Sequence, residues 1–128
     1  MWLLCLAFMA WGCRESVPRS TDPLWRPPAT AQALEAEVTF SGTQIAIANR
    51  STEVWRDVRI SVGRAGDPPA YTYRTDAILP GRTLVMGVLN FARPDDTRLN
   101  PFRVPPTRWA VLATLETGHT GFSEGLFE

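Results

Sequence analysis

From Glu37 to the end of the chain, apolar residues alternate with polar ones in short runs that turn residues separate. Strict alternation puts every second side chain on the same face of an extended strand, so that one face is buried and the other meets solvent. In the clearest run, Val58, Ile60 and Val62 alternate with Asp57, Arg59 and Ser61. Short runs of this kind, repeated at close intervals, are typical of a β-sandwich or barrel.

Similar runs along the chain predict about seven strands in all. Residues 38–40 and 43–49 predict a hairpin, and 107–116 and a last run with Phe122 and Leu126 predict two further strands. The run 82–91 is apolar on both faces, so we expect a central strand that is covered from two sides. The sequence lacks helices that could cover a parallel sheet, and we therefore expect an all-β antiparallel sandwich.

The first thirteen residues (MWLLCLAFMAWGC) are uncharged, and Arg14 and Glu15 follow at once. Their apolar core would span about 20 Å as a helix, against about 30 Å of hydrocarbon in a bilayer. This length is typical of the hydrophobic region of a secretory signal. The segment AWGC at 10–13 resembles the lipobox of bacterial lipoproteins, which implies cleavage before Cys13 and a lipid on its sulfur. An ordinary secretory signal and a buried apolar N-terminus remain alternatives.

The sequence divides into three parts, which we expect to be a lipoprotein-type signal segment at 1–13, a Pro-rich linker at 14–34 and a β-sandwich domain at 35–128. Four prolines in 14–31 favour an extended tether, although AQALEAE at 31–37 predicts one helical turn. Trp25 interrupts this tether, and we expect it to pack on the domain rather than bind a partner. The predicted location is the bacterial cell envelope, with the membrane as a partner through the lipid anchor.

Composition limits the function of the domain. About 95 residues form one compact unit, and both cysteines, Cys5 and Cys13, precede it, so its stability must come from packing. Thirteen basic residues, all arginine, balance thirteen acidic ones along the chain. This balance provides no basic stripe for a phosphate backbone, and we expect no nucleic-acid partner.

Several short segments resemble small exported bacterial proteins that carry an immunoglobulin-like or fibronectin-like sandwich. They are 45–62 (IAIANRSTEVWRDVRISV), Tyr71-x-Tyr73, Ile78-x-Pro80-Gly81-x-Thr83, Phe91 and Asn100-Pro101-Phe102. These segments specify turns and core positions. The resemblance therefore implies an immunoglobulin-like fold and carries over no catalytic residue.

Few residues are candidates for chemistry. His119, the only histidine, lies in a predicted turn at 117–121, where we expect it to be solvated. Asp95, Asp96 and Asn100 could offer oxygen ligands to calcium, but we expect a solvated turn there and predict no metal or other cofactor. Asn49-Arg50-Ser51 matches the N-glycosylation pattern, and we expect it to initiate a turn instead.

The aromatic residues are the remaining candidates for a binding surface. We expect Trp55 and Trp109 to fill the core. Tyr71 and Tyr73 lie on the same face of a predicted strand, and they would form a recognition surface if that face met solvent.

Three functions follow from these expectations. The first is an envelope-anchored, non-enzymatic binding or structural module that meets a protein or glycan through a sheet face or the loop 92–106. The second is an accessory subunit of an envelope enzyme or transport complex, which a long bare sheet edge would favour. The third is a secreted hydrolase that uses Asp95, Asp96 or His119, which a deep pocket around His119 would favour.

Overall fold

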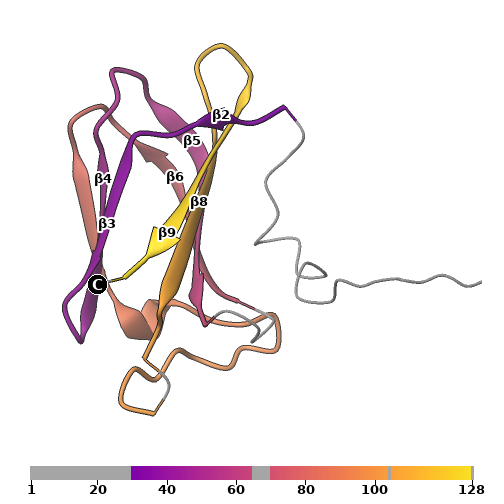
Figure 1. The fold of residues 1–128 in the computed structure, drawn as a ribbon. Helices are drawn as coiled ribbons and strands as arrows, with labels where there is room; N and C mark the ends of the chain where they lie inside the picture. Colours follow the sequence, from indigo (N-terminus) through magenta and orange to yellow (C-terminus); the bar gives the residue numbers. More distant parts are fainter. Residues whose placement is uncertain (1–29, 65–69, 104, 128) are drawn as a thin grey trace, which may run out of the picture.

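The computed structural model describes residues 30–64, 70–103 and 105–127. These residues form eight strands in two sheets that face each other (Figure 1). The strands are β2 (Gln32–Ala33), β3 (Ala36–Phe40), β4 (Gln44–Asn49), β5 (Trp55–Gly63), β6 (Tyr71–Ile78), β7 (Thr83–Gly87), β8 (Arg108–Thr114) and β9 (Thr120–Leu126). A 3-10 helix, η3 (Val88–Asn90), follows β7. The expected all-β architecture of two sheets is confirmed.

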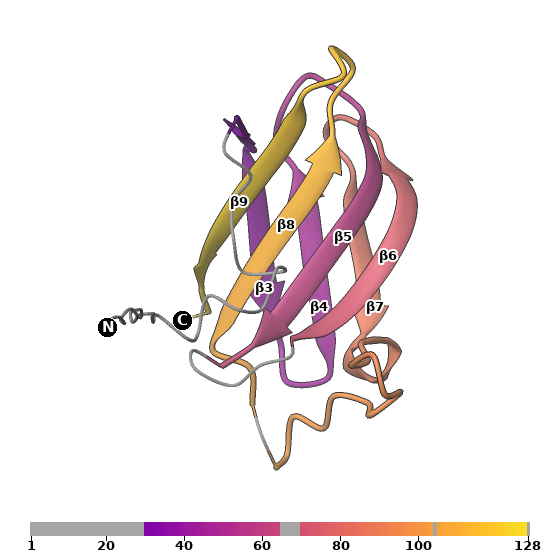
Figure 2. The same cartoon turned by 90° about the vertical axis from the view of Figure 1, so that its right-hand side faces the viewer.

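One sheet has five strands in the order β2-β9-β8-β5-β6, and the other has three in the order β3-β4-β7 (Figure 2). All neighbours are antiparallel except β2, which pairs with β9 in parallel. The larger sheet is therefore mixed, and the expectation of a purely antiparallel sandwich is wrong at this edge.

The helical turn expected at 31–37 is absent, because β2 and the start of β3 occupy these residues. Leu34 donates its N–H to Phe122 O at 3.1 Å, and Arg50 donates its N–H to Glu35 O at 2.8 Å. An isolated helical turn has little stability of its own, whereas two existing strands offer these backbone groups partners. Strand pairing thus begins at Gln32, inside the segment assigned to the linker.

The core lies between the sheets, and β5 contributes most of one side. Val58, Ile60 and Val62 are buried against the three-stranded sheet, which confirms the inward face expected from their alternation. Ile45 and Ile47 of β4 are buried on the other side. Burial of each such side chain stabilises the fold by about 1.5–3 kcal/mol.

The prediction of a central strand at 82–91 is wrong. β7 is an edge strand of five residues, and the chain then enters η3. Val85 is 53% exposed and Leu89 is 65% exposed. Met86 and Val88 point into the core. Among the described residues, no element covers the opposite face of β7. The apolar run therefore did not mean that both faces of the strand are buried.

The hairpin expected at 38–49 is confirmed as β3 and β4, with Gly42 at a φ of 91° in the turn. The expected strand at 107–116 is confirmed as β8, and Trp109, Val111 and Ala113 are buried on its core face. In β9 the register places Phe122 beside Leu112 on the outer face of the larger sheet, where it packs with Ala110 and Ala70.

The signal segment at 1–13, Cys13, the linker as far as residue 29 and Trp25 lie outside the described residues. Within the described ranges, no helix has the length and hydropathy needed to cross a membrane.

Candidate binding surfaces

Asn49 organises the turn between β4 and β5 from inside the protein. Its side chain is fully buried (0% exposed); Nδ2 donates to Glu53 O at 2.8 Å and to Ile78 O at 2.9 Å. Its Oδ1 accepts the N–H of Ser51 at 2.9 Å and lies 2.7 Å from Ser51 Oγ. The turn interpretation of Asn49-Arg50-Ser51 is confirmed, because all polar atoms of this amide have protein partners.

The four candidate aromatic residues face the core. Trp55 and Trp109 are buried, as expected. Tyr71 and Tyr73 pair with Val62 and Ile60, so they share the inward face of the sheet. Tyr71 is buried and Tyr73 is half-buried. The two tyrosines therefore do not form a solvent-facing recognition surface.

The residues considered for hydrolysis lie far apart. His119 belongs to the exposed β8–β9 turn, where Nδ1 is 2.9 Å from Thr117 Oγ1. Asp95 and Asp96 belong to the loop between η3 and β8, at the opposite end of the sandwich (Figure 2). The structure therefore does not bring the histidine and the carboxylates into one site.

The loop that carries Asp95 and Asn100 uses their oxygens for its own hydrogen bonds. Asp95 Oδ1 accepts the N–H of Thr97 at 3.0 Å, and Asn100 Oδ1 accepts the N–H of Phe102 at 3.1 Å. Hydrogen bonding by the side chain and then the backbone of Thr97 holds the pKa of Asp95 below its ordinary value. Across the described ranges, no three His, Cys, Asp or Glu residues gather to hold a metal ion.

Figure 1 shows β3 and β9 on the same side of the sandwich, one from each sheet. A groove of about 390 Å³ lies between them. We call it the β3–β9 groove, and both apolar and polar groups line it: Ala36, Glu37, Val38, Thr39, Phe40, Trp109, Leu126 and Phe127. The rings of Phe40 and Phe127 meet at a centroid distance of 5.8 Å, and Leu126 is 75% exposed. Apolar side chains at the mouth of a groove favour contact with another apolar group.

Two strand edges border this groove. Just before β3, Glu35 O accepts a hydrogen bond from Arg50, which follows β4, so alternation turns the backbone groups of Val38 and Phe40 away from β4. In β9, Phe122 O accepts a hydrogen bond from Leu34 and so points away from β8. By the same alternation, the backbone groups of Glu124 and Leu126 also point away from β8. β3 pairs only with β4 among the described strands, and β2 covers β9 only as far as Phe122. The outward N–H and C=O groups on both edges therefore remain open to another strand.

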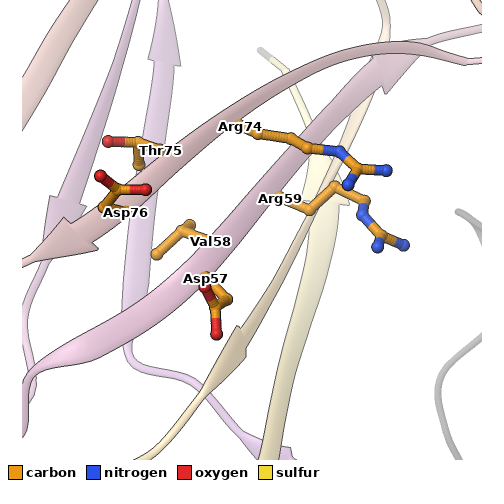
Figure 3. Close-up of a pocket in the computed structure, with 6 residues that line it drawn as sticks. All are labelled: Asp57, Val58, Arg59, Arg74, Thr75 and Asp76. Atoms are coloured by element: carbon orange, nitrogen blue, oxygen red, sulfur yellow. The ribbon is translucent and has the colours of Figure 1, made fainter.

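A second concavity, of about 300 Å³, lies along β5 and β6 (Figure 3). We call it the β5–β6 depression, and six residues line it: Asp57, Val58, Arg59, Arg74, Thr75 and Asp76. Figure 3 shows the guanidinium groups of Arg59 and Arg74 side by side, with the carboxylates of Asp57 and Asp76 at the other end. Sequence reasoning missed this charge pattern, because it depends on the pairing of two strands.

A bulge in β5 shapes the depression. On the β8 side, Arg56 pairs with Thr114 but Arg59 pairs with Leu112, so β5 carries one extra residue. Asp57 absorbs it with a φ of 50°. Left-handed φ is uncommon outside glycine, and aspartate is one of the residues that tolerate it.

Neither a protein-family model nor a curated protein sequence matches the chain. The resemblance to small exported bacterial proteins therefore stays a prediction.

Proposed function

We propose that this chain is an exported bacterial envelope protein, anchored by a lipid on Cys13, whose domain is a non-enzymatic module that binds an extended segment of a partner protein. The observation that carries the proposal is the β3–β9 groove, because the two strand edges that flank it pair with no further described strand and apolar side chains lie between them. An added strand would satisfy the open backbone groups, while its alternate side chains would enter the groove.

We also propose an immunoglobulin-like topology for the domain. The strands β5, β8 and β9 share one sheet, and β3, β4 and β7 share the other. This division corresponds to strands C, F and G on one side and A, B and E on the other in immunoglobulin-like domains. The β6 strand next to β5 corresponds to C′, which supports the same proposal.

The envelope location and the lipid anchor are tested by comparing the full chain with its Cys13→Ser variant in a bacterial host. We expect the mature protein to begin at Cys13, to carry added acyl mass and to stay with membranes, because two or three acyl chains hold a protein stably in a bilayer. The variant should lose the acyl mass. An unprocessed, soluble wild-type chain would contradict the anchor.

The groove is tested with extended peptides selected by display against the full Cys13→Ser chain. We expect bound peptides to shift the amide resonances of 36–40 and 123–127 and to slow hydrogen exchange at Glu124 and Leu126. Leu126→Arg should weaken binding, because Leu126 lines the groove and a charge there would lose water when a peptide binds. Val85→Arg is the matched control, since Val85 is exposed on the other sheet. Peptides that map only to 92–103 would contradict the proposal.

The bare β3 edge also favours the second candidate, an accessory subunit of an envelope enzyme or transport complex. Crosslinking from Leu126 in intact cells separates the two roles. A stoichiometric complex that loses enzyme or transport activity with Leu126→Arg supports the accessory role, and binding without any change in such activity supports the simple module.

A further inference from the structure

The ladder between β5 and β6 places like charges opposite each other twice. Arg59 pairs directly with Arg74. Arg56 pairs with Ala77 and Val58 with Thr75, so the same count puts Asp57 across from Asp76. Like charges directly opposite on neighbouring strands are destabilising, and a different order of the same four residues would have made two ion pairs.

The four charges also have no partners among the described residues. The described residues provide no hydrogen bond or ion pair to the side chain of Arg59, Arg74, Asp57 or Asp76, and Arg59 Nε is buried without an acceptor. Figure 3 shows the guanidinium groups extending away from the two carboxylates. The depression thus has a doubly positive end and a doubly negative end that do not neutralise each other.

The spacing of these ends sets the size of a ligand. Two residues along a strand separate the Cα atoms of the arginine pair from those of the aspartate pair, a rise of about 6.6 Å. The side chains extend away from each other, so the charged groups lie farther apart than their Cα atoms. Guanidinium groups bind phosphate oxygens through paired hydrogen bonds, and carboxylates bind an ammonium group. A simple anion would be repelled by Asp57 and Asp76, and a simple cation would be repelled by Arg59 and Arg74.

We propose that the β5–β6 depression binds a small zwitterion in which a short spacer joins a phosphate to an ammonium group, as in phosphoethanolamine. The phosphate lies between Arg59 and Arg74, and the ammonium lies between Asp57 and Asp76. The bulge at Asp57 supports this role, because bulges re-aim side chains and occur often beside functional sites. The site uses none of the residues of the β3–β9 groove, so this proposal stands or fails independently of the proposed function.

The test is an NMR titration of the full Cys13→Ser chain with phosphoethanolamine, inorganic phosphate and ethanolamine. We expect amide shifts confined to 56–59 and 74–76, with phosphoethanolamine binding at least about tenfold more tightly than either half alone. Arg74→Gln and Asp76→Asn should each reduce its affinity to that of a half ligand. Equal binding of inorganic phosphate, or no shift with any compound, would overturn the proposal.

A charge exchange provides a second variant. Arg74→Asp combined with Asp76→Arg turns both like-charge pairs into opposite-charge pairs, so the protein should stay folded and lose phosphoethanolamine binding. Retained binding would contradict the assigned site. Sedimentation with phosphatidylethanolamine vesicles, against phosphatidylglycerol vesicles, then identifies the source of the group: selective binding indicates a lipid headgroup, and binding of free phosphoethanolamine alone indicates a soluble ligand.

Discussion

Replacement of Asn49 by alanine tests whether one buried amide holds the β4–β5 connection to the rest of the sandwich. The amide of Asn49 joins its own strand to Ile78 at the end of β6 and to Glu53 and Ser51 in the turn. Alanine removes both donors, so Ile78 O loses its side-chain donor in the interior. A buried polar group without a partner costs about 1–3 kcal/mol.

The other contacts of Asn49 contribute less. Glu53 O is part-buried and has a second contact, from Ser51 Oγ at 3.2 Å, and Ser51 can hydrogen-bond to water in the turn. Together we expect Asn49→Ala to lower the free energy of unfolding by about 2–4 kcal/mol, a large fraction of the 5–15 kcal/mol typical of a domain. For a domain of this size the melting temperature should fall by about 8–32 °C, at about 4–8 °C for each kcal/mol lost.

Urea denaturation followed by tryptophan fluorescence measures this loss, and the m-value should stay unchanged because the exposed surface is the same. Asn90→Ala is the matched control, since Asn90 is exposed, and it should change stability by less than about 0.5 kcal/mol. Asn49→Asp keeps the acceptor for Ser51 but loses both donors, so it should retain most of the destabilisation. A loss below about 1 kcal/mol for Asn49→Ala would refute the reasoning.

Two further predictions concern β9 and the long loop. A Cβ on Gly125 would lie 2.7 Å from the Trp109 ring, so Gly125→Ala should cost about 1–3 kcal/mol in denaturation experiments; Gly87→Ala, whose Cβ meets nothing closer than 3.8 Å, should cost little. Thr97→Val should raise the pKa of Asp95 toward its ordinary value in an NMR titration, because it removes the main hydrogen bond to the carboxylate. Because the pKa of Asp95 is lower in the folded state than in the unfolded state, its carboxylate stabilises the fold above the unfolded pKa. This stabilisation is lost as the pH falls through the folded pKa, so Thr97→Val should make the free energy of unfolding depend less on pH in the acid range.

The parts of the fold that sequence predicted well are those where one local pattern decides the outcome. The alternation around Val58, Ile60 and Val62 defined the inward face of β5, since period two and burial on one side act together. The same reasoning located β8, with Trp109 toward the core. The turn at Asn49 was recognisable because asparagine side chains commonly bond to nearby backbone groups.

The failures arose where the outcome depends on distant partners. The run around Val85 and Leu89 is as apolar as a buried strand, yet β7 lies at an edge because only β4 is beside it. The local sequence of 31–37 favours a helical turn, but its first part pairs with β9 and its last part pairs with β4, so it belongs to both sheets. Neither the β3–β9 groove nor the opposed charges at Arg59 and Arg74 could be seen before the strand register was known.

The groove exists because the first part of the described chain divides its pairing between the two sheets. The chain leaves β9 after Ala33 and joins β4 at Ala36, so the rest of β9 and all of β3 keep a free edge. Leu34 is buried at the crossing, and a Cβ on Gly121 would lie 2.3 Å from its Cδ2 atom. The absence of a side chain at Gly121 therefore permits the crossing, and the crossing leaves both edges unpaired. The same few residues that complete the sandwich thus create the surface to which we assign binding.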